Sequence, residues 1–140
     1  MTRALRILFV EDMADSQRVG LRLFQAYGHQ VKLASNGREA VDLFAREPFD
    51  LVVMDLQMPE MDGWQAAQEI RRRETASRRT PIIAVSAYCY QSDRERFEAA
   101  GINAFVAKPI DNSRLMQTIA AVCGDSGNST SAERNEAMTE

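Results

Sequence analysis

Carboxylate, hydroxyl and ammonium side chains directly follow short apolar runs at four separate places in this sequence. They are Glu11 and Asp12, then Asp55, Ser86 and Lys108. Carboxylates at close quarters repel one another unless a cation lies among them. Their hard oxygen atoms favour Mg²⁺, which binds a few carboxylates and keeps positions open for water or phosphate oxygens. If folding brings these side chains together, the set is therefore suited to binding a metal ion and a phosphoryl group.

Asp55 is the candidate nucleophile of the set. It ends the unbroken apolar run 51–54, and carboxylates form acyl phosphates in enzymes. In-line phosphoryl transfer needs positioning and charge neutralisation more than covalent chemistry from the protein. Lys108 can supply positive charge, and Ser86 can donate a hydrogen bond to a phosphoryl oxygen. The use of lysine supports this role, because the chain has two lysines against fifteen arginines and a compact ammonium is not interchangeable with a guanidinium.

The elements that must position these residues are short buried strands alternating with helices. Continuous apolar runs of this length suit strands that are covered on both faces. Asn36 and Glu39 resemble a capping box at a helix start, and Gly28 and Gly101 are expected to end helices. The expected strands are 7–10, 31–34, 51–55, 81–85 and 104–107, and the expected helices are 15–27, 36–44, 64–73, 92–100 and 111–122.

This alternation predicts an α/β fold, a doubly wound five-stranded parallel sheet with helices on both faces. The flavodoxin-like strand order 2-1-3-4-5 is one common solution at this size. Ligands of such sheets bind at the carboxyl ends of the strands. Because the first, third, fourth and fifth strands all end on candidate residues, we expect the whole set to meet at one edge of the sheet.

Three further interpretations concern single side chains. In the helix at 15–27, we expect an inward face of Val19, Leu23, Phe24 and Tyr27. His29 follows a glycine in a turn and is interpreted as a surface residue. The arginines at 71–73 are interpreted as a solvated helix end, given the acidic total charge.

Composition indicates one domain in a reducing, aqueous compartment. The 140 residues allow a single domain with a proper core, which we expect over residues 1–123, followed by a disordered polar tail at 124–140. The net charge of −3 argues against nucleic acid as a partner. Cys89 and Cys123 match no metal or redox spacing, and no apolar run is long enough for a membrane span. We therefore expect a cytoplasmic protein that binds neither nucleic acid nor membrane.

Longer motifs surround the candidate residues. Asp55 lies in MDLQMPEMDG, Ser86 in TPIIAVSA and Lys108 in AKPI, while Glu11 and Asp12 follow the first strand. With these motifs the chain resembles a receiver domain of the two-component response-regulator family, over about residues 6–122. It is most similar to receivers of hybrid sensor kinases and phosphorelays. The resemblance implies a phosphorylation-activated switch in which Asp55 accepts a phosphoryl group from a histidine on a sensor kinase or a histidine phosphotransfer protein.

The resemblance also implies a role for each site residue. Asp12, Asp55 and the backbone carbonyl of Gln57 would bind Mg²⁺, with Glu11 helping directly or through water. By the same resemblance, Lys108 pairs with the phosphoryl oxygens, and the peptide bond from Lys108 to Pro109 is cis. The resemblance also implies that Ser86 forms a hydrogen bond to the phosphoryl group on activation and that Phe105 is the switch aromatic. Serine and phenylalanine replace the more common threonine and tyrosine at these last two positions.

Alternatives remain beside the free-standing switch. The chain could be the receiver segment of a larger hybrid histidine kinase, and its downstream target is open. An aspartyl-phosphate hydrolase of the haloacid-dehalogenase type would need an acidic residue two positions after the nucleophile, where this chain has Gln57. A nucleotide or flavin module would need a glycine-rich turn after the first strand, yet that turn reads EDMAD. We therefore expect no enzyme activity beyond the chain's own phosphorylation and slow dephosphorylation.

Overall fold

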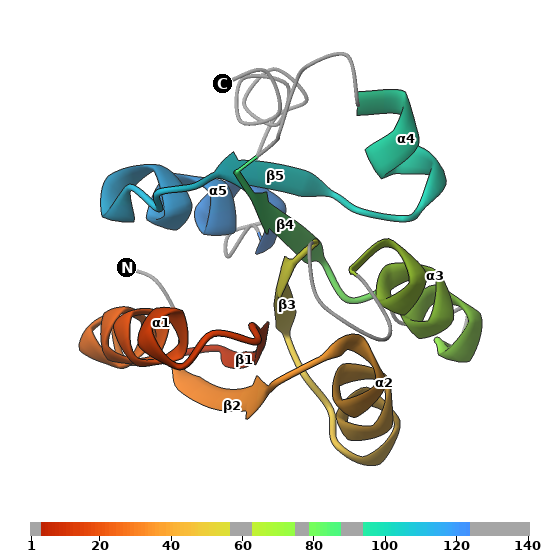
Figure 1. Ribbon diagram of the computed structural model, residues 1–140, viewed down its shortest axis with the longest axis horizontal. Helices are drawn as coiled ribbons and strands as arrows, with labels where there is room; N and C mark the ends of the chain where they lie inside the picture. The colour runs from red at the N-terminus through yellow and green to blue at the C-terminus, as the bar shows by residue number, and fades with distance from the viewer. Residues whose placement is uncertain (1–3, 57–62, 75–78, 88–93, 124–140) are drawn as a thin grey trace.

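Parallel strands form the central layer of the protein, with helices on both sides (Figure 1). The computed structural model describes residues 4–56, 63–74, 79–87 and 94–123. Within these residues the sheet has five strands in the order β2-β1-β3-β4-β5, so the predicted doubly wound topology is confirmed. The elements are β1 (Arg6–Val10), α1 (Ala14–Ala26), β2 (Gln30–Ala34), α2 (Gly37–Arg46), β3 (Leu51–Asp55), α3 (Gly63–Arg73), β4 (Ile82–Ser86), α4 (Arg94–Ala99), β5 (Ala104–Ala107) and α5 (Asn112–Cys123).

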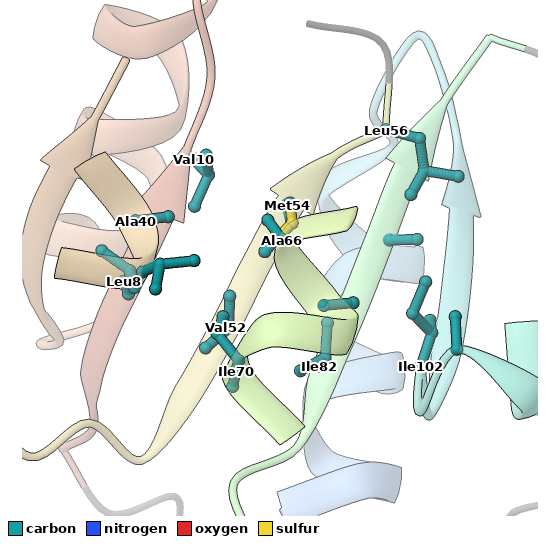
Figure 2. Close-up of a cluster of buried hydrophobic side chains, with 14 of the residues drawn as sticks. Leu8, Val10, Ala40, Val52, Met54, Leu56, Ala66, Ile70, Ile82 and Ile102 are labelled. Carbon is teal, nitrogen blue, oxygen red and sulfur yellow. The ribbon is translucent and has the colours of Figure 1, made fainter. Parts of the chain in front are cut away.

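Alternate residues of each strand face opposite helical layers. In β1, Ile7 and Phe9 belong to a buried cluster that includes residues of α1 and α5, while Leu8 and Val10 belong to a second cluster that includes residues of α2, α3 and α4. Figure 2 shows the cluster that contains Leu8 and Val10, in which Ile70 of α3 lies over Val52 of β3. A strand that is covered on both faces needs apolar residues at successive positions, which explains why β3 and β4 are buried along their whole length.

Local signals define most of the helix ends as expected. The side chain of Asn36 accepts a hydrogen bond from the backbone N–H of Glu39 at 2.9 Å, as the capping box predicts. Gly28 and Gly101 follow α1 and α4 at φ of +86° and +83°, a region that glycine enters without steric cost. The expected start of the fourth helix near Ser92 lies outside the described residues.

The predicted inward face of α1 is half wrong. Leu23 and Phe24 are buried, but Val19 is 64% exposed and Tyr27 is 54% exposed. The helix contacts the sheet through Gly20, where an added Cβ would lie 2.3 Å from a ring carbon of Phe9. Because the close approach is at Gly20, the helix is turned so that its neighbour Val19 faces outward.

His29 is a buried residue and not the surface residue that its turn position indicated. Its side chain is 5% exposed, and Nδ1 accepts a hydrogen bond from the backbone N–H of Leu5 at 3.0 Å. Burial lowers the pKa of His29 below its usual value. The turn after α1 brings the imidazole to the residue that precedes β1, a long-range contact that the local sequence pattern does not reveal.

Arg71 is likewise not a solvated helix end. Its side chain is 13% exposed and pairs with the carboxylate of Glu74 at 2.8 Å. The guanidinium also donates to the backbone oxygens of Thr80 and Gly101 and to Oδ1 of Asn103. This group therefore joins the end of α3 to the segments before β4 and β5, whereas the two arginines that follow it are exposed.

Candidate functional site

The ends of four strands bring the predicted residues to one edge of the sheet. In the sheet register Asp55 pairs with Val85, and Ser86 pairs with Ala107. The backbone N–H of Lys108 donates to the backbone oxygen of Ser86 at 2.9 Å, which continues the β4–β5 ladder by one residue. The parallel register therefore places residues from distant parts of the sequence side by side.

The ammonium group of Lys108 lies between two buried carboxylates. Nζ donates to Oδ2 of Asp55 at 2.9 Å and to Oε1 of Glu11 at 3.2 Å. Glu11 is 2% exposed and Asp55 is 5% exposed. The peptide bond from Lys108 to Pro109 is cis, as expected. The pairing of this lysine with phosphoryl oxygens, which the resemblance implies, stays a prediction; the structure places its ammonium against two carboxylates.

Burial and charge act in opposite directions on these groups. Burial raises the pKa of Glu11, as does the nearby charge of Asp55, while hydrogen bonds from the Met13 backbone and from Lys108 oppose the rise. Burial alone would lower the pKa of Lys108, but its contacts with Asp55 and Glu11 raise it overall. The lysine is therefore held in its charged form between the carboxyl groups of Glu11 and Asp55.

Glu11, Asp12 and Asp55 form a group that could hold a cation. One carboxylate oxygen from each lies within 4.8 Å of the others. Glu11 and Asp55 are buried, whereas Asp12 is exposed, so the group opens to solvent on one side. A few carboxylates with room for water suit Mg²⁺. The expected fourth ligand, the backbone carbonyl of Gln57, lies outside the described residues.

Glycine at the start of α3 keeps the neighbourhood of Asp55 compact. The backbone N–H of Gly63 donates to the backbone oxygen of Leu56 at 3.1 Å. A Cβ at this position would lie 2.6 Å from the backbone oxygen of Asp55. Any other residue would therefore push the first turn of α3 away from the strand end that carries the candidate nucleophile.

Phe105, the candidate switch residue, lies in a column of stacked rings. Its side chain is buried, and its ring centroid is 4.8 Å from that of Phe97 in α4. Phe97 stacks in turn on Trp64 of α3 at 5.0 Å, and the guanidinium of Arg96 lies 4.0 Å from the centre of the Trp64 ring. The ring of Phe105 is thus already inside the protein, in contact with two helices through this column.

Sequence reasoning found the acidic residues, Ser86 and Lys108. It missed Gln17, whose side chain donates to the backbone oxygen of Glu11 at 2.6 Å, and it missed the part that Arg96 and Phe97 play in the ring column. Gln17 and Arg96 are polar residues of helices, and such residues are usually solvated. Phe97 looks like an ordinary core residue in the sequence. Only the approach of α3, α4 and β5 reveals the ring column, and only the turn into α1 brings Gln17 to the acidic edge.

Comparisons with known proteins agree with this arrangement. The family model described as the response regulator receiver domain matches residues 7–120. Probable histidine kinase 2 of Oryza sativa is 32% identical over 134 residues, which cover 85% of this chain. The chain spans about 13% of the length of that relative.

Two solved structures have the same fold. One is the receiver domain of a sensor histidine kinase from Pseudomonas aeruginosa, solved with a magnesium ion in its active site cleft. It is 36% identical, has a TM-score of 0.78, and covers 88% of this chain and 100% of that one. The other is the Saccharomyces cerevisiae receiver domain of Ssk1, solved with the histidine phosphotransfer protein Ypd1 (27% identity, TM-score 0.78, 86% and 90% covered). This chain belongs to the response regulator receiver domains of two-component and phosphorelay signalling.

Proposed function

We propose that Asp55 accepts a phosphoryl group from a phosphohistidine and that the chain thereby changes its partner-binding surface. The observation that carries this proposal is the ammonium of Lys108 between the buried carboxylates of Asp55 and Glu11, at 2.9 and 3.2 Å. The carboxylate lies at a strand end, beside a fixed positive charge and an acidic group that is open to solvent. From such a position a carboxylate can attack a phosphorus atom while the positive charge neutralises the phosphoryl oxygens.

In the proposed reaction a carboxylate oxygen of Asp55 forms a bond to phosphorus while the bond from phosphorus to the histidine nitrogen breaks. The electron pair of that bond leaves with the imidazole, and the product is an acyl phosphate. Mg²⁺, when bound by Asp12, Asp55, the carbonyl of Gln57 and Glu11, supplies positive charge to the phosphoryl oxygens. Lys108 moves from the carboxylate to one of these oxygens, and Ser86 donates a hydrogen bond to another.

The magnesium part of the proposal is supported by the donor set. Two buried carboxylates and an exposed one with oxygens within 4.8 Å of each other repel strongly, and one lysine does not balance them. The similar Pseudomonas receiver was solved with this ion in its cleft, which also supports the proposal of Mg²⁺ binding. Asp12→Ala is therefore expected to weaken Mg²⁺ binding more than any change at Ser86.

The phosphodonor is proposed to be a sensor histidine kinase or a histidine phosphotransfer protein. The yeast receiver, solved with such a phosphotransfer protein, supports this class of partner. The much longer rice kinase supports a second arrangement, in which these residues act as the receiver segment of a hybrid histidine kinase.

We further propose residues 1–123 as the receiver and 124–140 as a polar tail, in a protein that works in the cytoplasm. The structure has no helix long and apolar enough to cross a membrane among its described residues.

Switching is proposed to run from Asp55 through Ser86 and Lys108 to Phe105. Reversing a two-state population from 1:99 to 99:1 requires roughly 5.5 kcal/mol. A hydrogen bond to a charged group supplies about 1.5–3 kcal/mol, so Ser86 and Lys108 must act together. Because the ring of Phe105 in β5 stacks on that of Phe97 in α4, movement of β5 would displace α4 directly.

A small phosphodonor separates this function from that of a hydrolase. Incubation with acetyl phosphate and Mg²⁺ is expected to add one acid-stable, base-labile phosphoryl group per chain. Asp55→Asn should take up none, while the matched change Asp42→Asn, at an exposed aspartate of α2, should behave like wild type. Steady turnover of phosphate esters without a stable protein-bound group would instead indicate a hydrolase.

A further inference from the structure

One glutamine of α1 reaches back to the loop that carries the acidic residues. The side-chain Nε2 of Gln17 donates to the backbone oxygen of Glu11 at 2.6 Å and to Oγ of Ser35 at 3.3 Å. Its backbone N–H donates to the backbone oxygen of Met13 at 2.9 Å. Gln17 therefore binds the main chain on both sides of Asp12.

Asp12 needs such support more than the other two carboxylates do. Glu11 and Asp55 are buried, so packing restricts them, but Asp12 is exposed. Its position depends on the main chain that carries it. Met13, at the start of α1, contributes no side-chain cap to hold this turn. The contacts of Gln17 thus fix the segment from which Asp12 projects.

The same glutamine belongs to a longer set of hydrogen bonds. The backbone N–H of Glu11 donates to the backbone oxygen of Ala34 at 2.9 Å, and Oε2 of Glu11 accepts from the N–H of Met13 at 3.1 Å. Ser35, which Gln17 contacts, donates its own N–H to Glu39 at 2.8 Å. The segment 11–13 is therefore connected through Gln17 both to α1 and, by way of Ser35, to the start of α2.

We propose that Gln17 is a positioning residue that prearranges Glu11 and Asp12 for the cation. The inference rests on the proposed function and adds to it a determinant of metal affinity that is not itself a ligand. Outer partners that orient metal ligands typically change affinity by about 10–100-fold when they are removed. Gln17 acts on the main chain and not on a ligand atom, so we expect the lower end, about tenfold.

The test compares Gln17→Met with Gln25→Met, a change at an exposed glutamine later in the same helix. Methionine keeps the length and helix propensity of glutamine but removes the amide donor. Mg²⁺ is titrated into each protein while amide chemical shifts are followed. Hydrogen exchange at the Met13 amide is measured without metal. Gln17→Met should bind Mg²⁺ about tenfold more weakly and exchange the Met13 amide faster, with the amides of β3 unchanged; Gln25→Met should match wild type.

Several outcomes would overturn the inference. Wild-type Mg²⁺ affinity together with wild-type exchange at Met13 in Gln17→Met would show that the contact positions nothing. If Gln17→Met does not fold, Ser35→Ala removes the outer contact alone and should give smaller changes of the same sign; no change in either measurement would again reject the role of Gln17. Failure of the wild-type protein to bind Mg²⁺ would reject the proposed metal site, while exchange at Met13 would still decide whether Gln17 holds the loop.

Discussion

Lys108→Met should destabilise the metal-free protein far more than the same change at the chain's other lysine. The substitution keeps much of the aliphatic stem and removes the ammonium that lies 2.9 Å from Asp55 and 3.2 Å from Glu11. Two buried carboxylates then lose the ammonium that lies between them. The control, Lys32→Met, removes an ammonium that is 3.5 Å from Glu47 on a side chain that is 53% exposed.

The size of the effect follows from the burial of the three groups. At an effective dielectric constant of about 20, each contact of Lys108 contributes roughly 5 kcal/mol of attraction before desolvation. The side chain is 26% exposed, and the cost of desolvating it offsets much of that attraction. Removing one partner of a buried ion pair costs about 3–5 kcal/mol, so for this partly open site we expect a loss of about 2–4 kcal/mol. An exposed pair such as that of Lys32 contributes about 0–1 kcal/mol.

Urea unfolding of the metal-free proteins at neutral pH measures both losses. Since burial raises the pKa of Glu11, this residue favours the folded state below its unfolded value of 4.5, and the contribution is lost as pH rises through the folded pKa. The defect of Lys108→Met should therefore shrink on acidification towards pH 5. Adding Asp55→Asn should also restore part of the stability. A loss no larger than that of Lys32→Met, at every pH, would refute the electrostatic description of the site.

Three further predictions concern the switch and the core. Burial lowers the pKa of His29, so the stability contributed by its neutral form is present above the unfolded pKa of 6.5 and is lost as pH falls below that value. In urea unfolding, His29→Asn should therefore lose less stability than wild type between pH 7.5 and 5.5. Equal losses in the two proteins would contradict this. Arg96→Ala should cost about 0.5–1 kcal/mol by removing a cation–π contact and should shift the emission of Trp64, whereas Arg22→Ala, at an exposed site on α1, should do neither. Ser86→Ala should still be phosphorylated, but beryllofluoride should then move the amide shifts around Phe105 and α4 less than in wild type; shifts of wild-type size would exclude Ser86 from the coupling.

The sequence predicted the residues whose positions depend on topology alone. Asp55 and Lys108 end apolar runs, and parallel strands in the order 2-1-3-4-5 must bring their carboxyl ends to one edge. Conversely, Val19, His29 and Arg71 were misplaced because their surroundings come from other elements: the ring of Phe9 beside Gly20, the N–H of Leu5 and the oxygen of Gly101. The alternation of strands and helices follows from local patterns, whereas the rotation of a helix and the partners of its polar side chains are settled only by packing.

The most direct test of the central claim is transfer from a phosphorus–nitrogen bond to Asp55. Phosphoramidate, which carries the type of bond found in phosphohistidine, is mixed with the protein and Mg²⁺, and intact mass and peptide mapping locate the added group. One phosphoryl group on the peptide that contains Asp55, absent from Asp55→Asn and retained in Asp42→Asn, is the predicted result. The same phosphoryl uptake in Asp55→Asn, or its location on another residue, would contradict the account.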